Sequence, residues 1–350
     1  TGNPLEIVKK LMAEYATAPM DHLPDFIGGA VGYIGYDMIR NHHQITSTHV
    51  DDLKMPDIHL LLTKEVIVYD HAKQQIKIII NVPLSGNLEV LYADAVHRLH
   101  EIKKEILEAK SPIGVNNANE LQEIKYSSNE TKEGFMKKVL IAKEHIANGD
   151  VQQVVLSQRL QVETKVSPFQ AYRTLRGINP SPYMFYIDFG DYHLVGSSPE
   201  LLSKVKGNTI VTCPIAGTRP RGENAKQDHQ YAKELLEDKK ELAEHLMLVD
   251  LSKNDIKKVA KAGTIQVNPF MEVQKYSHVM HIVSLVTGEK RDDCDMYDGL
   301  MACLPAGTVS GSPKPRAMEI IDTLENKKRG PYAGAVGYLG FNGNMDTCIT

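Results

Sequence analysis

At residues 214–222 the chain reads Pro214-Ile215-Ala216-Gly217-Thr218-Arg219-Pro220-Arg221-Gly222, between a β-like run and a highly charged helical segment. Gly217 permits backbone conformations closed to other residues and lets a ligand approach the main chain. Arg219 and Arg221 carry guanidinium groups, whose planar fork suits carboxylates. The stretch therefore predicts an anion site. On composition alone, an ordinary surface loop with two solvated arginines is an equal alternative.

The composition is that of a soluble globular protein. The 350 residues are 42% hydrophobic and 24% charged, which allows a sizeable core and indicates two lobes. The net charge is −4 with 40 basic and 44 acidic residues interspersed, so neither a nucleic-acid-binding face nor a membrane-surface helix is indicated. The four cysteines form no Cys-x-x-Cys pair, which argues against a zinc site or a disulfide framework.

The ends of the sequence carry two further expectations. Residues 1–10 lack the apolar region of a signal peptide and no apolar run reaches the length of a membrane span, so we expect a cytoplasmic protein. The first residue is not Met, and residues 345–350 have the pattern of an interrupted strand. We therefore expect a chain truncated at both ends.

The order of predicted elements mixes helices and strands along the whole chain. A partial N-terminal region is expected over residues 1–110, a linker rich in Asn, Ser and Gly over 111–130, and a catalytic domain, incomplete at its C-terminus, over 131–350. Apolar periodicity predicts helices at 4–15, 88–107, 132–147, 228–250 and 316–324 and strands at 28–36, 58–81, 151–162, 183–189, 193–195, 201–205 and 209–213. Asn148-Gly149 is a pair typical of a helix end.

One Gly-rich segment occurs twice. Gly28-Gly29-Ala30-Val31-Gly32-Tyr33-Ile34-Gly35-Tyr36 is repeated as Ala333-Gly334-Ala335-Val336-Gly337-Tyr338-Leu339-Gly340-Phe341. Glycines this dense in a strand mark bulges or close backbone contacts. Two similar β-lobes facing each other would explain the repeat, and chance similarity of Gly-rich strands is the alternative.

Two carboxylates stand on one face of a predicted helix. Glu241 and Glu244 are three residues apart, a spacing that suits Mg²⁺, which takes few protein oxygens and keeps its waters. The neighbouring acids and lysines make a plain solvated helix face the stronger interpretation of this pattern alone.

Two later segments also carry chemical residues. His278 and His281 lie in an apolar, β-branched run, where a hydrogen-bonded core histidine is commoner than a general acid or base. In the loop 305–314, Ser312 can cap the following helix with Pro313 at its first position, which predicts a second carboxylate pocket.

Six motifs then carry a specific resemblance. In order along the chain they are Gly196-Ser-Ser-Pro-Glu200, Pro214-Ile-Ala-Gly-Thr-Arg-Pro-Arg221, Glu244-His-Leu-Met-Leu-Val-Asp-Leu-Ser-Lys-Asn-Asp255, His278-Val-Met-His281, Gly307-Thr-Val-Ser-Gly-Ser-Pro-Lys314 and Gly330-Pro-Tyr-Ala-Gly-Ala-Val-Gly-Tyr338. Together they resemble the anthranilate synthase component I group of the chorismate-utilising enzymes, over almost the whole chain.

The resemblance implies an α+β fold, a two-lobed stacked β-sheet sandwich flanked by helices. It implies a Mg²⁺-dependent lyase of the oxo-acid-lyase type in tryptophan biosynthesis. Chorismate and ammonia give an aminodeoxyisochorismate intermediate, which loses pyruvate to yield anthranilate. A separate glutamine amidotransferase subunit, component II, would supply the ammonia.

The resemblance also implies residue roles at matching positions. Glu200 corresponds to the general acid for the departing C4 hydroxyl, and His281 to the histidine that assists pyruvate elimination. Glu241 and Glu244 correspond to half of the Mg²⁺ site. The implied positions beside chorismate are Gly217, Thr218, Thr308 (counted with the catalytic residues) and Tyr332, which matches a carboxylate-binding tyrosine.

Two positions bear on the exact activity. Relatives that activate water or make the para isomer usually carry lysine at the position of Ala216, so its absence favours ammonia and the ortho product. Pro182, Tyr183 and Met184 resemble the segment that contacts the feedback inhibitor tryptophan, with a plain helix-to-strand connection as the alternative. Aminodeoxychorismate synthase component I and a catalytically incomplete chorismate-binding fragment stay open as alternative functions.

Overall fold

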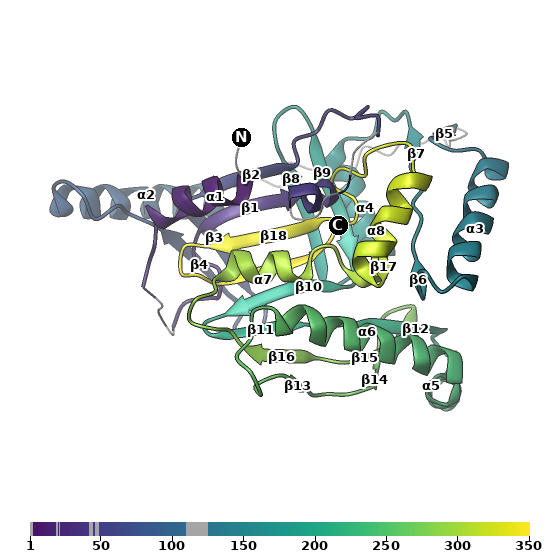
Figure 1. The fold of residues 1–350 in the computed structure, drawn as a ribbon. Coiled ribbons are helices and arrows are strands. Elements are labelled where there is room, and N and C mark those ends of the chain that lie inside the picture. Colours follow the sequence, from purple (N-terminus) through teal and green to yellow (C-terminus); the bar gives the residue numbers. More distant parts are fainter. Residues whose placement is uncertain (1–2, 19, 21, 42–44, 46–48, 110–124) are drawn as a thin grey trace.

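The structure is a computed structural model that describes residues 3–350 except 19, 21, 42–44, 46–48 and 110–124. Its centre is an antiparallel sheet of eight strands in the order β13-β16-β11-β10-β19-β18-β1-β2 (Figure 1). The strands span Gly29–Ile34 (β1), Ile58–Thr63 (β2), Leu201–Lys206 (β10), Thr209–Thr212 (β11), Gln266–Val267 (β13), Val286–Glu289 (β16), Ala335–Gly340 (β18) and Met345–Ile349 (β19).

The two Gly-rich segments are neighbouring strands of this one sheet. β1 pairs with β18 in a register that sets Gly29 opposite Gly340 and Gly32 opposite Gly337. A Cβ on Gly32 would lie 2.0 Å from the carbonyl oxygen of His59 on β2, so only glycine permits this close approach of the backbones. The expectation that the repeat forms two facing lobes is therefore wrong.

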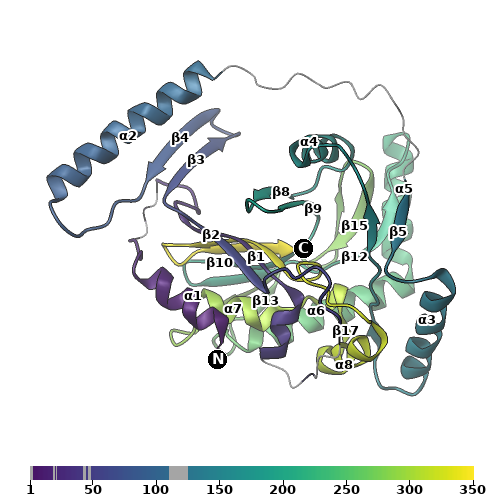
Figure 2. The same cartoon turned by 90° about the horizontal axis from the view of Figure 1, so that it is seen from above.

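Successive residues of the sheet pack against different layers, as the period of a strand requires. Ile34 belongs to the largest apolar cluster, which joins the sheet to α1, α6 and α7 on one face (Figure 2). Tyr33 points to the other face, where it packs with Ile187 and Val336 beneath the β8–β9 hairpin. This layered arrangement confirms the α+β class. The elements span Pro4–Ala13 (α1), Tyr183–Asp188 (β8), His193–Ser198 (β9), Lys239–Lys257 (α6) and Met296–Cys303 (α7).

A second, smaller sheet carries the stretch that opens the sequence analysis. Its three strands run in the order β12-β15-β14, and Leu235, Met280 and Ile282 form its buried core against α5 and α6. These elements span Ile215–Pro220 (β12), Ala225–Glu237 (α5), Glu272–Lys275 (β14) and Val279–Val283 (β15).

The predicted helix 228–250 is two helices. Asp238 has an extended backbone (ψ 104°) that ends α5, and its carboxylate accepts hydrogen bonds from the backbone N–H groups of Lys240 (3.0 Å) and Glu241 (3.3 Å). This is an N-cap, so a new helix begins at once. This break lets α6 take a direction different from that of α5 and run along the sheet.

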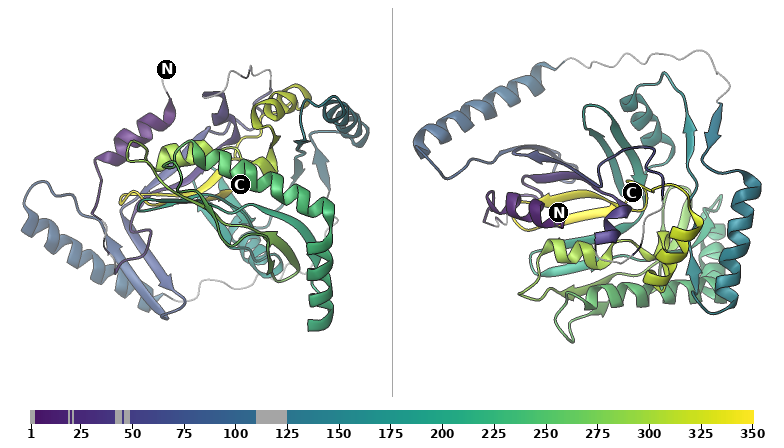
Figure 3. Two further views of the ribbon diagram at one scale, coloured as in Figure 1. Left: turned by 60° about the horizontal axis from the view of Figure 1, so that its bottom comes forward. Right: turned by 45° about the horizontal axis from the view of Figure 1, so that its top comes forward.

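The remaining elements surround these sheets. A hairpin, β3–β4, carries the long helix α2 on one side (Figure 3). In the described part of the chain, no helix combines the length and the apolar character needed to cross a membrane. The elements span Tyr36–Asn41 (η1), Glu65–Asp70 (β3), Gln75–Ile80 (β4), Leu88–Glu108 (α2), Tyr126–Ser128 (β5), Lys132–Ala147 (α3), Gln153–Val154 (β6), Leu160–Val162 (β7), Pro168–Ile178 (α4), Gly307–Val309 (η2), Gly311–Ser312 (β17) and Lys314–Leu324 (α8).

Two observations bear on the expected division into an N-terminal region, a linker and a catalytic domain. Most of the expected linker, residues 110–124, lies outside the described residues, and β5 occupies part of the rest. Strands β1 and β2 of the N-terminal region belong to the same sheet as β10, β18 and β19. The two regions therefore share a core.

Candidate active site

A β-bulge brings three of the expected substrate-site residues together. The pairing of β12 with β15 slips between Ala216 and Thr218, so that Thr218 faces His281 and Gly217 is the extra residue. Gly217 has φ 67°, a conformation that costs other residues conformational strain. A Cβ there would also lie 3.0 Å from Leu235 Cδ1. The bulge therefore requires glycine at this position.

The bulge fixes the proton position on His281. Its Nδ1 lies 2.9 Å from the carbonyl oxygen of Gly217 and 3.1 Å from Thr218 Oγ1. A carbonyl oxygen only accepts, so Nδ1 carries the hydrogen and Nε2 keeps the free lone pair. His281 is therefore oriented as a base through Nε2.

Helix α6 presents Glu241 and Glu244 beside this bulge. The carboxylate of Glu241 reaches within 3.3 Å of the position of a Cβ on Gly217 and lies 3.7 Å from Arg219 Nη1. Glu244 is half-buried, and its carboxylate has no ion-pair partner among the described residues. No cluster of three metal-ligating side chains occurs in the described ranges. Two carboxylates one turn apart suit Mg²⁺, which needs few protein ligands.

The expected general acid lies in a second cluster. Glu200 sits between β9 and β10, and Thr308 Oγ1 of η2 lies 3.1 Å from its Oε1 and 3.0 Å from its Oε2. Burial raises the pKa of Glu200 to about 8, although the hydrogen bond from Thr308 acts to lower it. The carboxyl group therefore keeps its proton at neutral pH and can act as an acid.

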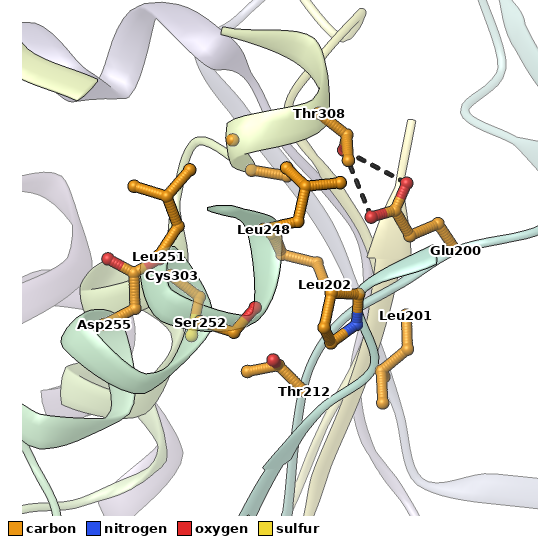
Figure 4. Close-up of a pocket in the computed structure, with 13 residues that line it drawn as sticks. Glu200, Leu201, Leu202, Thr212, Leu248, Leu251, Ser252, Asp255, Cys303 and Thr308 are labelled. Atoms are coloured by element: carbon orange, nitrogen blue, oxygen red, sulfur yellow. Dashed lines mark hydrogen bonds between the residues drawn. The ribbon is translucent and has the colours of Figure 1, made fainter. Parts of the chain in front are cut away.

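A small cavity of about 30 Å³ adjoins this cluster (Figure 4). Helix α6 forms one wall through Leu248, Leu251, Ser252 and Asp255, while Thr212 and Pro214 at the end of β11 form another. Since an α-helix rises 1.5 Å per residue, Glu244 lies only about 6 Å along the axis from Leu248. Helix α6 thus links the acid cluster to the pair of carboxylates.

Tyr332 lies in the loop before β18 and is 47% exposed. The guanidinium of Arg329 lies 5.8 Å from its ring centroid. Arg329 itself is buried and donates to the carbonyl oxygens of Val309 (2.7 Å) and Val155 (2.8 Å) and to the carboxylate of Glu325 (2.6 Å). This arginine therefore ties the Tyr332 loop to the turn that carries Thr308.

The expected inhibitor segment forms the start of a hairpin. Pro182 directly precedes β8, and Tyr183 and Met184 are its first residues, paired with Ser198 and Ser197 of β9. The hydroxyl of Tyr183 donates to Asp346 Oδ1 on β19 (3.0 Å). Because β9 leads within two residues to Glu200, this hairpin is directly connected to the acid cluster.

The structure corrects the expected anion sites. Arg219 lies 2.8 Å from Asp238 Oδ2, and Arg221 lies 2.6 Å from Asp228 Oδ2, so both guanidinium groups are used within the protein. Ser312 belongs to β17, and α8 begins at Lys314 without a side-chain cap. The predicted N-cap is therefore wrong.

Lys314 also has an internal partner. Its ammonium group contacts the carboxylate of Asp255 and donates to the carbonyl oxygen of Cys303 (3.0 Å), and Lys258 donates to the same carboxylate (3.0 Å). Asp255 and Lys314 stand in two of the quoted motifs, but no local pattern indicates that they meet. Arg329 was missed too, although Glu325 stands four residues before it, a spacing at which opposite charges often pair.

Known proteins resemble the whole chain. Residues 2–350 match the family described as chorismate binding enzyme. Anthranilate synthase component 1 of Acetivibrio thermocellus is 52% identical over 353 residues, covering 100% of this chain and 72% of that protein. The protein of the same name from Aquifex aeolicus is 45% identical over 350 residues, covering 100% and 71%.

Two solved structures of chorismate-utilising enzymes are similar to this chain. Anthranilate synthase component I of Streptococcus pneumoniae has a TM-score of 0.87 at 38% identity, covering 99% of this chain and 76% of that chain. The menaquinone-specific isochorismate synthase of Escherichia coli has a TM-score of 0.68 at 19% identity, covering 97% and 80%, and so shares the fold.

Proposed function

Because the chain belongs to the chorismate binding enzyme family, we propose that it is the anthranilate-forming subunit that converts chorismate and ammonia into anthranilate and pyruvate. The observation that carries the proposal is a carboxyl group that keeps its proton, Glu200, at a cavity walled by α6, together with a base, His281, on the small sheet that packs against the same helix. Loss of a hydroxyl needs an acid, and loss of pyruvate needs proton transfer.

The first half-reaction uses Glu200. Hydroxide is a poor leaving group, so the protonated carboxyl donates its proton to the C4 hydroxyl oxygen of chorismate as the C–O bond breaks. Ammonia adds to the ring and gives the amino intermediate. Thr308 holds the Glu200 carboxyl through its hydroxyl and so fixes the direction of the proton.

The second half-reaction uses His281. Its Nε2 takes the proton from the ring carbon that bears the new amino group, and the enolpyruvyl C–O bond breaks, which makes the ring aromatic. The leaving enolpyruvate takes up one proton at its methylene carbon and becomes pyruvate, so the proton removed from the ring is balanced. Gly217 and Thr218 hold the imidazole in this orientation. Tyr332, exposed beside Arg329, would hold a substrate carboxylate.

Glu241 and Glu244 are the residues that would hold Mg²⁺. When bound, the ion supplies positive charge for a carboxylate of the substrate. The half-buried Glu244 carboxylate, without an ion-pair partner among the described residues, supports this assignment.

The nucleophile is ammonia rather than an activated water. Ala216 is buried at 7% exposure directly before the bulge and offers no amino group.

We further propose that a glutamine amidotransferase subunit supplies the ammonia in the cytoplasm, because the relatives are named component 1. Tryptophan is the proposed inhibitor at Pro182, Tyr183 and Met184.

The test is product analysis. The natural full-length protein that contains this chain is incubated with chorismate, Mg²⁺ and ammonium, and the products are separated and identified. Anthranilate and pyruvate in equal amounts support the proposal. Isochorismate or a para-amino product instead of anthranilate contradicts it.

A further inference from the structure

The hydroxyl of Thr212 is the starting point of the inference, which rests on the proposed role of Glu200. Thr212 ends strand β11 and is 5% exposed. Its Oγ1 is fully buried and has no hydrogen-bond partner among the described residues. A buried hydroxyl without a partner costs about 1–3 kcal/mol, so native proteins nearly always satisfy it.

The space beside this hydroxyl has the size and polarity of a water site. Thr212 lines the cavity of about 30 Å³, together with Ser252, Asp255, Glu200 and Thr308. A site needs at least roughly 10–15 Å³ of such volume to hold a water, and the water needs two to four polar partners. The cavity therefore has room for at least one water, and the hydroxyls of Thr212 and Ser252 and the carboxyl groups of Glu200 and Asp255 line it (Figure 4).

The cavity also has two chemically different ends. At one end Glu200 is held by Thr308. At the other end Asp255 accepts hydrogen bonds from the ammonium groups of the buried Lys314 and of Lys258, whose side chain is 58% exposed. Waters between these ends would join the acid to a charged group that reaches solvent.

We propose that this cavity is a water site and that Thr212, assisted by Ser252, is a positioning residue that holds the water from which Glu200 recovers its proton. Each turnover removes one proton from Glu200, when its O–H bond breaks and the departing hydroxyl leaves as water. The cavity water then donates a proton to the carboxylate, and takes one in turn from bulk solvent along the Asp255 side. The proton that the attacking ammonia sheds as it becomes an amine returns to solvent, so each turnover consumes no net proton.

The charged and titratable groups around the cavity come from every wall. Cys213 follows Thr212, and its pKa is raised to about 11 by burial and by the nearby Glu200. Cys303 lies at the end of α7. Asp255 on α6 and Lys314 on α8 form a pair. A change at Thr212 leaves these charges in place, which makes it a clean test.

The experiment compares Thr212→Val with Thr212→Ser in the natural full-length protein. Valine keeps the shape but removes the hydroxyl, and serine keeps the hydroxyl. We expect Thr212→Val to lower kcat roughly tenfold, a small part of the 10²–10⁴ that a general acid contributes, with an increased solvent isotope effect and an unchanged KM for chorismate. Thr212→Ser should restore both kcat and the isotope effect.

A crystal structure supplies a second measurement that needs no activity. We expect an ordered water within hydrogen-bond distance of Thr212 Oγ1 in the wild-type protein. A well-defined structure without this water overturns the proposal, as does a folded Thr212→Val variant whose kcat and isotope effect match the wild type. If the wild type forms no anthranilate, the proposed function is overturned. The crystal structure then still tests the water site, because it shows the presence or absence of the water independently of activity.

Discussion

At the scale of single residues, the proposed role of Glu200 predicts that the reaction depends on pH in one direction. Its pKa of about 8 lies above the usual value of a carboxyl group because of burial, and its protonated form is the one that the proposed mechanism uses. With free ammonia held constant, kcat should therefore be level at neutral pH and fall tenfold per pH unit once the pH exceeds about 8. A steady-state pH profile measures this.

The control for this profile is Glu200→Gln, which cannot donate a proton. It should lose at least about 10²-fold in kcat and show no fall at alkaline pH. An alkaline limb that persists in Glu200→Gln would assign the titration to another group.

His281 should act after Glu200. Replacement by methionine removes Nε2 and puts an apolar side chain of similar length in its place. The rate of elimination should therefore fall by a factor of about 10²–10⁴ while amination continues. The amino intermediate should build up, as chromatography of the reaction would show. His278→Met is the matched control, because His278 is exposed, hydrogen-bonds to Ser277 and has no assigned role in the reaction. Anthranilate without any intermediate from His281→Met would give the histidine another role.

Glu244 should set the dependence on Mg²⁺. A neutral amide is a poorer ligand for this ion than a carboxylate. Glu244→Gln should therefore abolish turnover at low Mg²⁺ and regain part of it at high Mg²⁺, which titration of the rate with Mg²⁺ measures. Glu237→Gln, at the exposed end of α5, is the control and should behave as wild type. A Glu244→Gln rate equal to wild type at subsaturating Mg²⁺ would rule out this ligand.

At the scale of elements, the buried pair of Arg329 and Glu325 joins α8, β6 and η2. Arg329 is 7% exposed and Glu325 also accepts from the backbone N–H of Ser157 (2.7 Å). Removing one partner of a buried pair costs about 3–5 kcal/mol. Glu325→Gln should therefore lower the free energy of unfolding by about this amount in a denaturant titration.

The exposed pair of Arg316 and Glu319 on the same helix is the control. Glu319→Gln removes its charge as Glu325→Gln does, yet should change the unfolding midpoint little. Equal effects of the two substitutions would show that burial of the Arg329 pair is unimportant.

Sequence patterns predicted a helix correctly where the residues at its two ends determine its bounds. The helix 132–147 appears with these bounds, because Thr131 caps its start and Asn148-Gly149 end it. The break at Asp238 was missed, since an acidic residue among lysines also suits a helix interior. Glu200 and His281 were proposed from motifs and their roles stay predictions, whereas the bulge at Gly217 could be recognised only with its partner strand in place.

At the scale of the whole molecule, long-range pairing escaped prediction. The pairing of β1 with β18 joins residues some 300 positions apart, and nothing in either strand specifies its neighbour. The partners of Arg219 and Arg221 also escaped prediction, over shorter distances: Asp238 stands between α5 and α6, and Asp228 lies on α5. Charge and turn residues predicted a site there but could not show that the protein itself neutralises the two arginines.

This shared sheet gives the last prediction. Residues 125–350 alone would leave the edge of β18 unpaired and uncover Val336 and Leu339, which are 3% and 2% exposed. Such a fragment should lack a cooperative thermal transition and bind a hydrophobic dye, whereas residues 1–350 should unfold cooperatively. The comparison uses circular dichroism and dye fluorescence. A cooperative transition in the fragment would show that residues 131–350 form an independent domain, as the proposed boundary suggests.

Helix α6 carries Glu241 and Glu244 near its start and Ser252 and Asp255 near its end, without interruption between them. One residue inserted between these pairs would turn everything beyond it by about 100° around the helix axis, since a turn takes 3.6 residues. The pair of carboxylates and the cavity wall would then face different directions. We therefore expect a one-residue insertion between Glu244 and Ser252 to disrupt the site even though it removes no side chain from the helix.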